Sequence, residues 1–208
     1  MGVNGRSQGS GARSQGDGDG ERLNVLLTGP PGVGKTTAIR KVLALLRGVK
    51  VGGFFTEAIE EGGRRTGFAL IDLAGPRGVL ASARVSGGPR VGRYGVNVAD
   101  MERIGVPALL HALESADLIV CDEIGRMELH CPEFRHAIVR CLDSSRPVLG
   151  TIQARRNEFL DGVRARPDVE LVSVAVDSRD SLPALLARRL RVQWASTCEG
   201  DVSRLGSS

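Results

Sequence analysis

The segment from Leu27 to Thr37, LTGPPGVGKTT, limits most strongly what this chain can fold into. It carries the spacing G-x-x-x-x-G-K-[ST], with a short apolar run before it and a helical spacing of apolar residues after it. Glycines let backbone N–H groups turn inward around phosphate oxygens, and the start of a helix adds a positive dipole end. The segment therefore predicts a strand, a phosphate-binding loop and a helix in succession.

The side chains of this loop have separate expected roles. Lys35 would reach the β- and γ-phosphates of a nucleotide, and the Thr36 hydroxyl would ligate Mg²⁺. A glycine-rich turn that only caps a helix is the alternative, and the preceding strand pattern argues against it. The residues expected to contact the nucleotide are Gly29, Pro30, Pro31, Gly32, Val33, Gly34, Lys35, Thr36 and Thr37.

From Leu23 onward, short apolar runs alternate with amphipathic stretches. This alternation is typical of an α/β domain with a largely parallel sheet. Strands are predicted for Leu23–Gly29, Asp117–Gly125, Pro147–Ile152 and Val169–Val176, and helices for Thr36–Arg47, Ala99–Ile104, Pro107–Ala116, Pro132–Leu142, Glu158–Ala165 and the segment after an N-cap at Ser181.

The segment Phe54–Leu73 has a different pattern, with two strand-like runs around Gly62 and Gly63. Two glycines between such runs are typical of a tight hairpin turn. Opposite charges across the hairpin would support its register. The pairs expected are Glu61 with Arg64 and Glu60 with Arg65, and Gly78–Val85 could add a third strand to this antiparallel extension.

Two acids follow the apolar run Leu118–Cys121. Asp122 is placed to hold the water shell of a nucleotide-bound metal, as the acid at the end of a neighbouring strand does in P-loop proteins. Glu123 could polarise a water for attack on the γ-phosphate. The alternative is that both acids simply end a strand, and the phosphate loop upstream favours the catalytic interpretation.

Hydrolysis also needs a cation near the charge that develops on the transferred group. Arg126 is the nearest candidate, and Arg93, Arg155 and Arg156 are alternatives. Thr151 ends the next predicted strand, where it could contact the γ-phosphate or the attacking water, or serve only as a β-branched strand residue.

Composition excludes some other classes of protein. The formal net charge of +4 is spread along the chain, so nucleic acid is not indicated as a partner. No apolar run approaches the ~20 residues needed to span a bilayer, and no membrane partner is expected. The four cysteines form no C-x-x-C pair and do not gather with the three histidines, so we expect no zinc and a reducing, cytoplasmic setting.

The ends of the chain differ in composition from its middle. Residues 1–20 are rich in Gly and Ser and are expected to be a disordered tail, as residues 196–208 are expected to be a flexible one. Residues 21–195 are then a single domain. Its protein partners are not indicated by the sequence, and a monomer is preferred to an oligomer.

Together, several motifs resemble one known family, the small P-loop nucleoside triphosphatases of the thermophilic-bacterial type, whose vertebrate relatives are called cancer-related nucleoside triphosphatases. The resemblance covers roughly Leu23 to Leu190 in order. The segments that carry it are GPPGVGKTT, GGFFTEAIEEGGRRTGFALIDL, VGRYGVNV, DEIGRMEL and RPDVELVSV.

The resemblance implies a three-layer α/β/α fold of the additional-strand, RecA-like type, extended by the antiparallel hairpin. It also implies slow, Mg²⁺-dependent hydrolysis of ATP, GTP, CTP and UTP to diphosphate and phosphate. Relatives commonly have lysine at Arg126, and the two cations bind anions differently. A second nucleotide-site segment would be Leu118, Ile119, Val120, Cys121, Asp122, Glu123, Ile124 and Gly125.

Two other functions share the phosphate loop. A nucleoside or nucleotide kinase would need an acceptor pocket, and Tyr94 in VGRYGV could stack on its base. A nucleotide-dependent switch is a further alternative, since DEIG matches the D-x-x-G motif of GTPases. The match is weak, because the N-K-x-D motif that reads guanine is missing. We therefore expect a triphosphatase in which Lys35, Asp122, Glu123 and Arg126 carry the chemistry.

Overall fold

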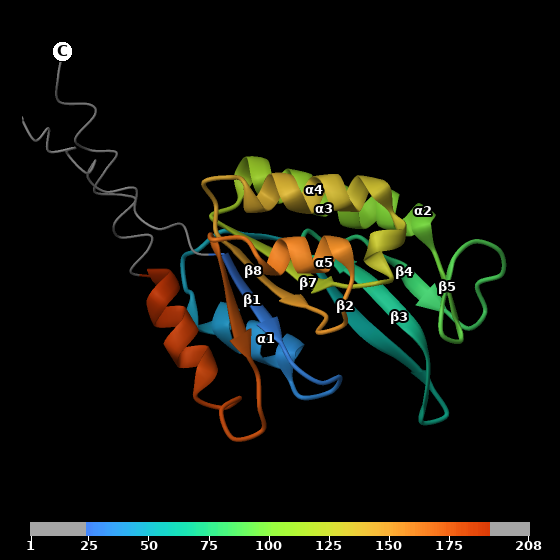
Figure 1. The fold of residues 1–208 in the computed structure, drawn as a ribbon, viewed down its shortest axis with the longest axis horizontal. Helices are drawn as coiled ribbons and strands as arrows, with labels where there is room; N and C mark the ends of the chain where they lie inside the picture. Colours follow the sequence, from blue (N-terminus) through green and yellow to red (C-terminus); the bar gives the residue numbers. More distant parts are fainter. Residues whose placement is uncertain (1–23, 192–208) are drawn as a thin grey trace, which may run out of the picture.

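The computed structural model describes residues 24–191. A mixed sheet crosses the molecule with helices on both faces (Figure 1). Its strand order is β5-β6-β4-β3-β2-β7-β8-β1-β9, and the five strands from β2 to β9 in this order run parallel. The strands are β1 (Asn24–Thr28), β2 (Val51–Glu61), β3 (Arg64–Asp72), β4 (Arg77–Ser82), β5 (Arg90–Val91), β6 (Tyr94–Val96), β7 (Leu118–Ile124), β8 (Val148–Ile152) and β9 (Val169–Ser173).

The helices connect the parallel strands and cover the sheet. They are α1 (Lys35–Leu45), α2 (Val98–Asp100), the π-helix η1 (Met101–Gly105), α3 (Val106–Ser115), the short 3₁₀-helix η2 (Glu128–His130), α4 (Pro132–Leu142) and α5 (Glu158–Arg164). Residues 182–191 form a further helix. Within residues 24–191, no helix has the length and apolar character required to cross a membrane.

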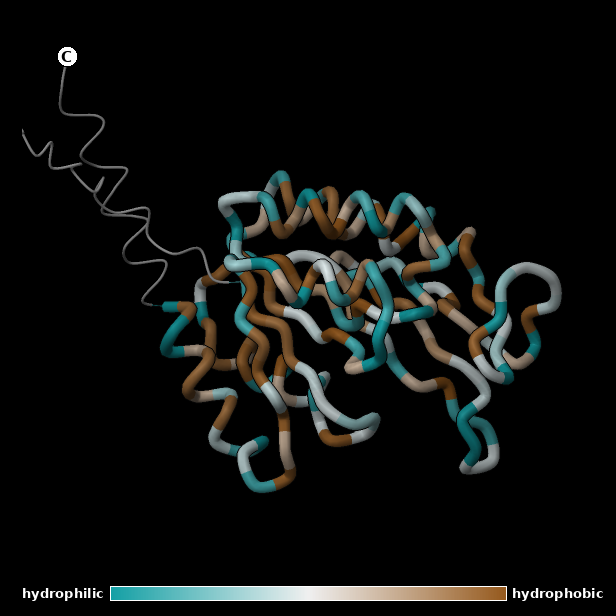
Figure 2. Tube along the Cα trace, in the orientation of Figure 1, coloured by the Kyte–Doolittle hydropathy of each residue, from teal (hydrophilic) through white to brown (hydrophobic). Residues whose placement is uncertain are grey.

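The side-chain alternation of β1 shows how the two layers form. Val25 and Leu27 pack with α1 and the helix at 182–191, whereas Leu26 faces the layer of α3, α4 and α5. All three side chains are fully buried, as expected for a strand covered on both faces. Figure 2 shows the strands between the helical layers as largely hydrophobic, so the sheet centre is the core of the molecule.

The antiparallel extension confirms the predicted hairpin. Gly62 and Gly63 have φ of 56° and 73°, a left-handed pair that glycine adopts without strain. Glu61 pairs with Arg64 and Glu60 with Arg65, in the expected register. Only the first part of β2, Val51–Phe55, pairs with β7, so the rest of β2 and β3 project beyond the carboxyl ends of the parallel strands.

The predicted elements are otherwise confirmed with small shifts in their ends, and α4 matches its prediction at both ends. The strands β5 and β6 were not predicted. Ser181 precedes the helix at 182–191, as predicted. Its hydroxyl donates to the Ser178 carbonyl at 3.1 Å, so the side chain does not form the predicted N-cap. The expected tails lie outside the described residues.

Candidate nucleotide-binding and catalytic site

The predicted phosphate loop connects β1 to α1 at the carboxyl edge of the sheet. Gly34 is the N-cap of α1, with φ of 109° and no side-chain capping bond. Gly29 has φ of 144°, and a Cβ there would lie 2.8 Å from the Val174 carbonyl oxygen. Glycine at these two positions therefore lets the backbone turn tightly, and the first N–H groups of α1 stay free for an anion.

Lys35 already lies along this loop. Its Nζ donates to the Gly29 carbonyl at 3.0 Å and to the Pro30 carbonyl at 3.2 Å. The ammonium is thereby held at the loop, where a bound phosphate chain would meet it.

Asp122 lies on β7, which is separated from β1 in the sheet by β8. Its carboxyl is almost fully buried, and its Oδ1 accepts a hydrogen bond of 2.7 Å from the Thr151 hydroxyl on β8. Burial raises the pKa of Asp122, while the Thr36 and Thr151 hydroxyls and Lys35 act to lower it. Thr151 therefore orients Asp122. It is more than a β-branched strand residue, which was one of the two alternatives that the sequence left open.

The second oxygen of Asp122, Oδ2, is buried without a hydrogen-bond partner. A buried carboxylate oxygen without a partner is costly unless a donor or a cation satisfies it. Carboxylate and hydroxyl oxygens are the ligands that Mg²⁺ prefers, directly or through water. Asp122 beside Thr36 thus fits a magnesium site on the chemistry of its donors.

Glu123 and the phosphate loop line the same cavity, of about 850 Å³. Burial raises the pKa of the Glu123 carboxyl, and the positive charge of Lys35 opposes that rise. A carboxyl whose pKa is raised accepts a proton more readily than an exposed one, as a general base must. The structure therefore brings the second acid of the pair to the loop, as the sequence interpretation required.

The predicted nucleotide-contacting residues do not all reach this cavity. In the loop, every one lines it except Val33, which packs into the core beside α1. In the second segment, Glu123 lines it, and Asp122 lies buried beneath. The remaining side chains support the strand: Leu118, Ile119, Val120, Cys121 and Ile124 are fully buried.

The four candidate arginines separate clearly. Arg126 and Arg155 line the cavity. Arg156 instead pairs with Asp161 at 3.0 Å. The Arg93 guanidinium donates to the Tyr94 hydroxyl at 2.8 Å, outside the cavity lining.

Gln153 and Glu128 are site residues that the sequence analysis did not single out. Gln153 lines the cavity, and its Oε1 accepts from the Arg126 backbone N–H at 3.2 Å. Glu128 also lines the cavity, and burial raises its pKa well above the ordinary value, with a further contribution from Glu123. Gln153 carries no local signal, whereas Glu128 lies in the motif DEIGRMEL.

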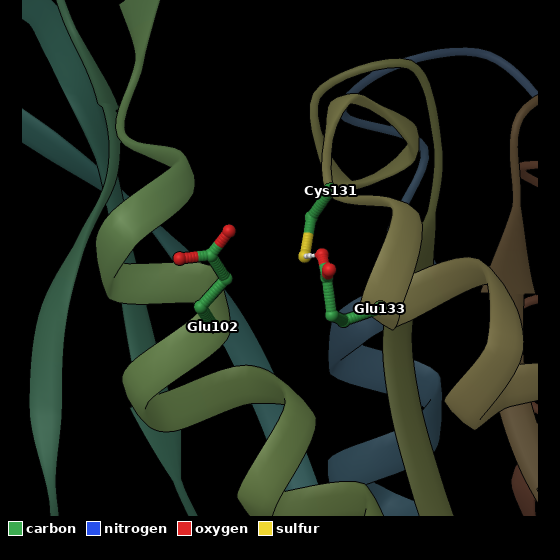
Figure 3. Close-up of side chains that lie close together, drawn as sticks. All are labelled: Glu102, Cys131 and Glu133. Carbon is green, nitrogen blue, oxygen red and sulfur yellow. Dashed lines mark hydrogen bonds between the residues drawn. The ribbon is translucent and has the colours of Figure 1, made fainter.

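A separate group of side chains that could ligate a metal ion consists of Glu102, Cys131 and Glu133 (Figure 3). The Cys131 thiol already caps α4 by accepting from the Phe134 backbone N–H at 3.4 Å. Burial raises the pKa of this thiol to about 11, which keeps it protonated at neutral pH. Because the thiolate is the form that binds metals, we assign Cys131 to helix capping.

The fold and the loop define the class of this molecule, a P-loop nucleotide-binding protein. A family model described as NTPase matches residues 24–187, so the chain belongs to this NTPase family.

Individual relatives agree with this assignment. The nucleoside-triphosphatase THEP1 of Thermofilum pendens is 48% identical over 172 residues, which cover 80% of this chain and 94% of the relative. Among solved structures, THEP1 from Aquifex aeolicus aligns with a TM-score of 0.74 at 32% identity, covering 81% of this chain and 99% of that one. A human cancer-related nucleoside triphosphatase aligns with a TM-score of 0.70 at 36% identity, over 82% of this chain and 98% of that one.

Proposed function

We propose that this protein hydrolyses nucleoside triphosphates to diphosphate and phosphate. The observation that carries the proposal is the position of Glu123, which lines one cavity with the phosphate loop and follows the buried Asp122. A protein that only stored nucleotides would have no need of an acid at this place. Family membership supports the same reaction.

In this proposal the loop residues bind and orient the phosphate chain. Backbone N–H groups at the start of α1 and the Lys35 ammonium contact the β- and γ-phosphates. Thr36 would hold Mg²⁺ directly and Asp122 would hold it through water, and Thr151 fixes the Asp122 carboxyl for this task. When bound, Mg²⁺ neutralises charge on the β- and γ-phosphates.

Glu123 then acts on the attacking water. Its carboxylate accepts a proton from the water as the water oxygen bonds to the γ-phosphorus and the bond from that phosphorus to the bridging oxygen breaks. Gln153 lies beside it: a Cβ at Gly125 would come within 2.6 Å of the Gln153 Nε2 and 3.0 Å of the Glu123 Oε1. The absence of a side chain at Gly125 is what lets these two groups approach.

Slow turnover and broad base specificity belong to the same proposal. Within residues 24–191, Arg126 and Arg155 make no ion pair that would fix a guanidinium over the γ-phosphate. We expect a turnover below ~10 s⁻¹, the median for enzymes. The described cavity lining contains one aromatic residue, Phe68, so the loop end offers no ring to select a base, and ATP, GTP, CTP and UTP should compete equally.

The finer classification and setting of the protein are also proposals. The strand β8 between β1 and β7 supports the additional-strand, RecA-like type. The three free cysteines of the described chain, Cys121, Cys131 and Cys141, support a reducing, cytoplasmic location. We propose a monomer that acts on nucleoside triphosphates.

The test is phosphate release with Glu123→Gln beside the parent. Removal of a general base should lower the rate by about 10²–10⁴-fold, while a fluorescent triphosphate analogue still binds. Glu114→Gln, at an exposed position of α3, is the matched control. If Glu123→Gln hydrolyses at the parent's rate, Glu123 is not the base; if the parent releases no phosphate from any of the four nucleotides, the hydrolase proposal itself is wrong.

A further inference from the structure

The cavity extends beyond the phosphate loop, over the antiparallel part of the sheet. We call this end the distal pocket. Its lining residues are Thr56, Ala58, Arg65, Phe68, Leu80, Val91, Met127 and Glu128. The strand β7 lies between β2 and the pair β8-β1 in the sheet, so Glu123 stands between the loop and the distal pocket.

The projecting hairpin forms the main wall of the distal pocket. Ala58 on β2 is the register partner of Phe68 on β3, and both line the cavity. The Tyr94 ring packs edge-on against Phe68, with 5.3 Å between the ring centroids. The Arg65 guanidinium lies over Phe68, 5.4 Å from its centroid. A planar guanidinium is a surface on which a planar ring can stack.

Among residues 24–191, the cations around the cavity form no ion pair with an acid. Ten ion pairs are formed among residues 24–191, and none includes Lys35, Arg65, Arg126 or Arg155. Two acids line the cavity: Glu123, the base of the proposed reaction, and Glu128, whose burial raises its pKa and so favours the neutral form. The cavity is therefore suited to more negative charge than one phosphate chain at the loop would use.

The triphosphate's own nucleoside should point away from this pocket. Lys35 reaches the β- and γ-phosphates, and Glu123 must face the γ-phosphate to activate water. The γ-end of the chain then points toward β7, and the nucleoside end points toward the opposite side of the loop. This step rests on the proposed function, because it uses the placement of the γ-phosphate at Glu123.

We propose that the distal pocket binds a second small molecule, a nucleoside monophosphate, at the same time as the triphosphate. Its base stacks on the Arg65 guanidinium above Phe68, against the apolar walls from Ala58, Leu80 and Met127. Its phosphate faces Arg126 and Arg155, next to Glu123. The distal pocket thus supplies a ring surface, and the adjoining part of the cavity supplies the cations Arg126 and Arg155, which matches the two parts of this ligand class.

The test is a calorimetric titration of AMP, GMP, CMP and UMP into the full chain saturated with Mg²⁺ and a non-hydrolysable triphosphate analogue. We expect one monophosphate to bind per chain with the analogue in place. Ribose 5-phosphate, which has no base, should bind at least about fivefold more weakly, since stacking of one base contributes ~1–3 kcal/mol.

Two variants locate the ligand. Phe68→Leu should weaken monophosphate binding by about fivefold or more, because it removes the ring but keeps apolar volume. Arg65→Gln, at an exposed position that does not endanger folding, should weaken it by about tenfold. The neighbouring Arg64→Gln is the control, because Arg64 does not line the cavity.

Three results would overturn the proposal: no saturable binding at millimolar monophosphate, equal binding by both variants and the parent, or displacement of the analogue by the monophosphate. Displacement would show that the two ligands use one site. None of these results affects phosphate release by the parent, so a failure here is distinguishable from a failure of the proposed hydrolysis.

Discussion

The two ends of the cavity are built in different ways. The loop end comes from one continuous segment, residues 29–37, and presents mostly backbone groups. The distal pocket comes from β2, β3, β4, β5, η2 and the connection from β7 to η2, and presents side chains. A site made of consecutive residues can be read from a short window of sequence, whereas a site assembled by strand pairing becomes visible only in the fold.

The difference also concerns what a substitution can do. At the loop end, the glycines and backbone N–H groups tolerate little change, and Lys35 is the one charged side chain of the segment. In the distal pocket, no single side chain holds the wall in place, because each strand is fixed by its neighbours. The largest effects on hydrolysis should therefore come from the loop end.

Lys35→Ala should have the largest effect. It removes the cation that meets the β- and γ-phosphates, and loss of one such stabilising group typically lowers kcat by about 10²–10³-fold. It also removes the two bonds from Nζ to the Gly29 and Pro30 carbonyls, so triphosphate affinity should fall as well. Phosphate release and analogue binding measure the two effects separately.

The control for this variant is Lys41→Ala. Lys41 lies on the same helix, and its exposed side chain pairs with Asp180, at 3.2 Å. An exposed pair contributes ~0–1 kcal/mol, so activity should stay within about twofold of the parent. Equal activity of Lys35→Ala and Lys41→Ala would refute the assignment of Lys35 to the phosphates.

Gly125→Ala should have an intermediate effect, because it acts on the boundary between the two ends. The new Cβ would press on the Gln153 Nε2 and the Glu123 Oε1, at 2.6 and 3.0 Å. A displacement of about 1 Å at a reacting group can lower the rate by about 10²-fold, so we expect a loss of roughly 10- to 100-fold in kcat. Steady-state phosphate release measures it.

Gly162→Ala is the matched substitution. Gly162 lies within α5, and a Cβ there would meet nothing within 4 Å. Alanine in place of glycine inside a helix stabilises by about 0.5–1 kcal/mol, so this variant should gain stability without losing activity. If Gly125→Ala is as active as Gly162→Ala, the close approach at Gly125 does not position Glu123.

The fold was predictable where local pattern decides it. The limits of α4 and the pairing of Glu61 with Arg64 followed from spacing and turn residues. The strands β5 and β6 have two and three residues and exist through their pairing with each other and with β4. Strands this short carry no periodicity, so no sequence window could reveal them.

The site was predictable in part for the same reason. Asp122 and Glu123 were found because they follow an apolar run, but the bond from Thr151 to Asp122 joins residues 29 positions apart. Spacing also could not distinguish Arg155, which lines the cavity, from Arg156, which pairs with Asp161. Side-chain direction in a connection depends on the tertiary contacts around it.

Substitution of Glu128 should have the smallest effect, and it is measured on the free energy of unfolding, which does not depend on catalysis. Burial raises the pKa of Glu128 in the folded protein well above its ordinary value, which it keeps in the unfolded chain. At a pH between the unfolded-state pKa and the folded-state pKa, the folded protein holds a proton that the unfolded chain has lost. The free energy of unfolding should therefore fall as pH rises through this window. One full proton of difference corresponds to at most about 1.4 kcal/mol per pH unit.

Glu128→Gln cannot ionise, so its unfolding free energy should fall less steeply with pH than that of the parent. Urea denaturation at a series of pH values measures both slopes. Glu114→Gln, exposed to solvent in the folded state, should keep the parent's slope. Parallel slopes for Glu128→Gln and the parent would mean that the Glu128 carboxyl ionises as readily in the folded protein as in the unfolded chain. The ionised carboxylate would then add a negative charge beside Glu123, where the distal pocket needs a neutral group.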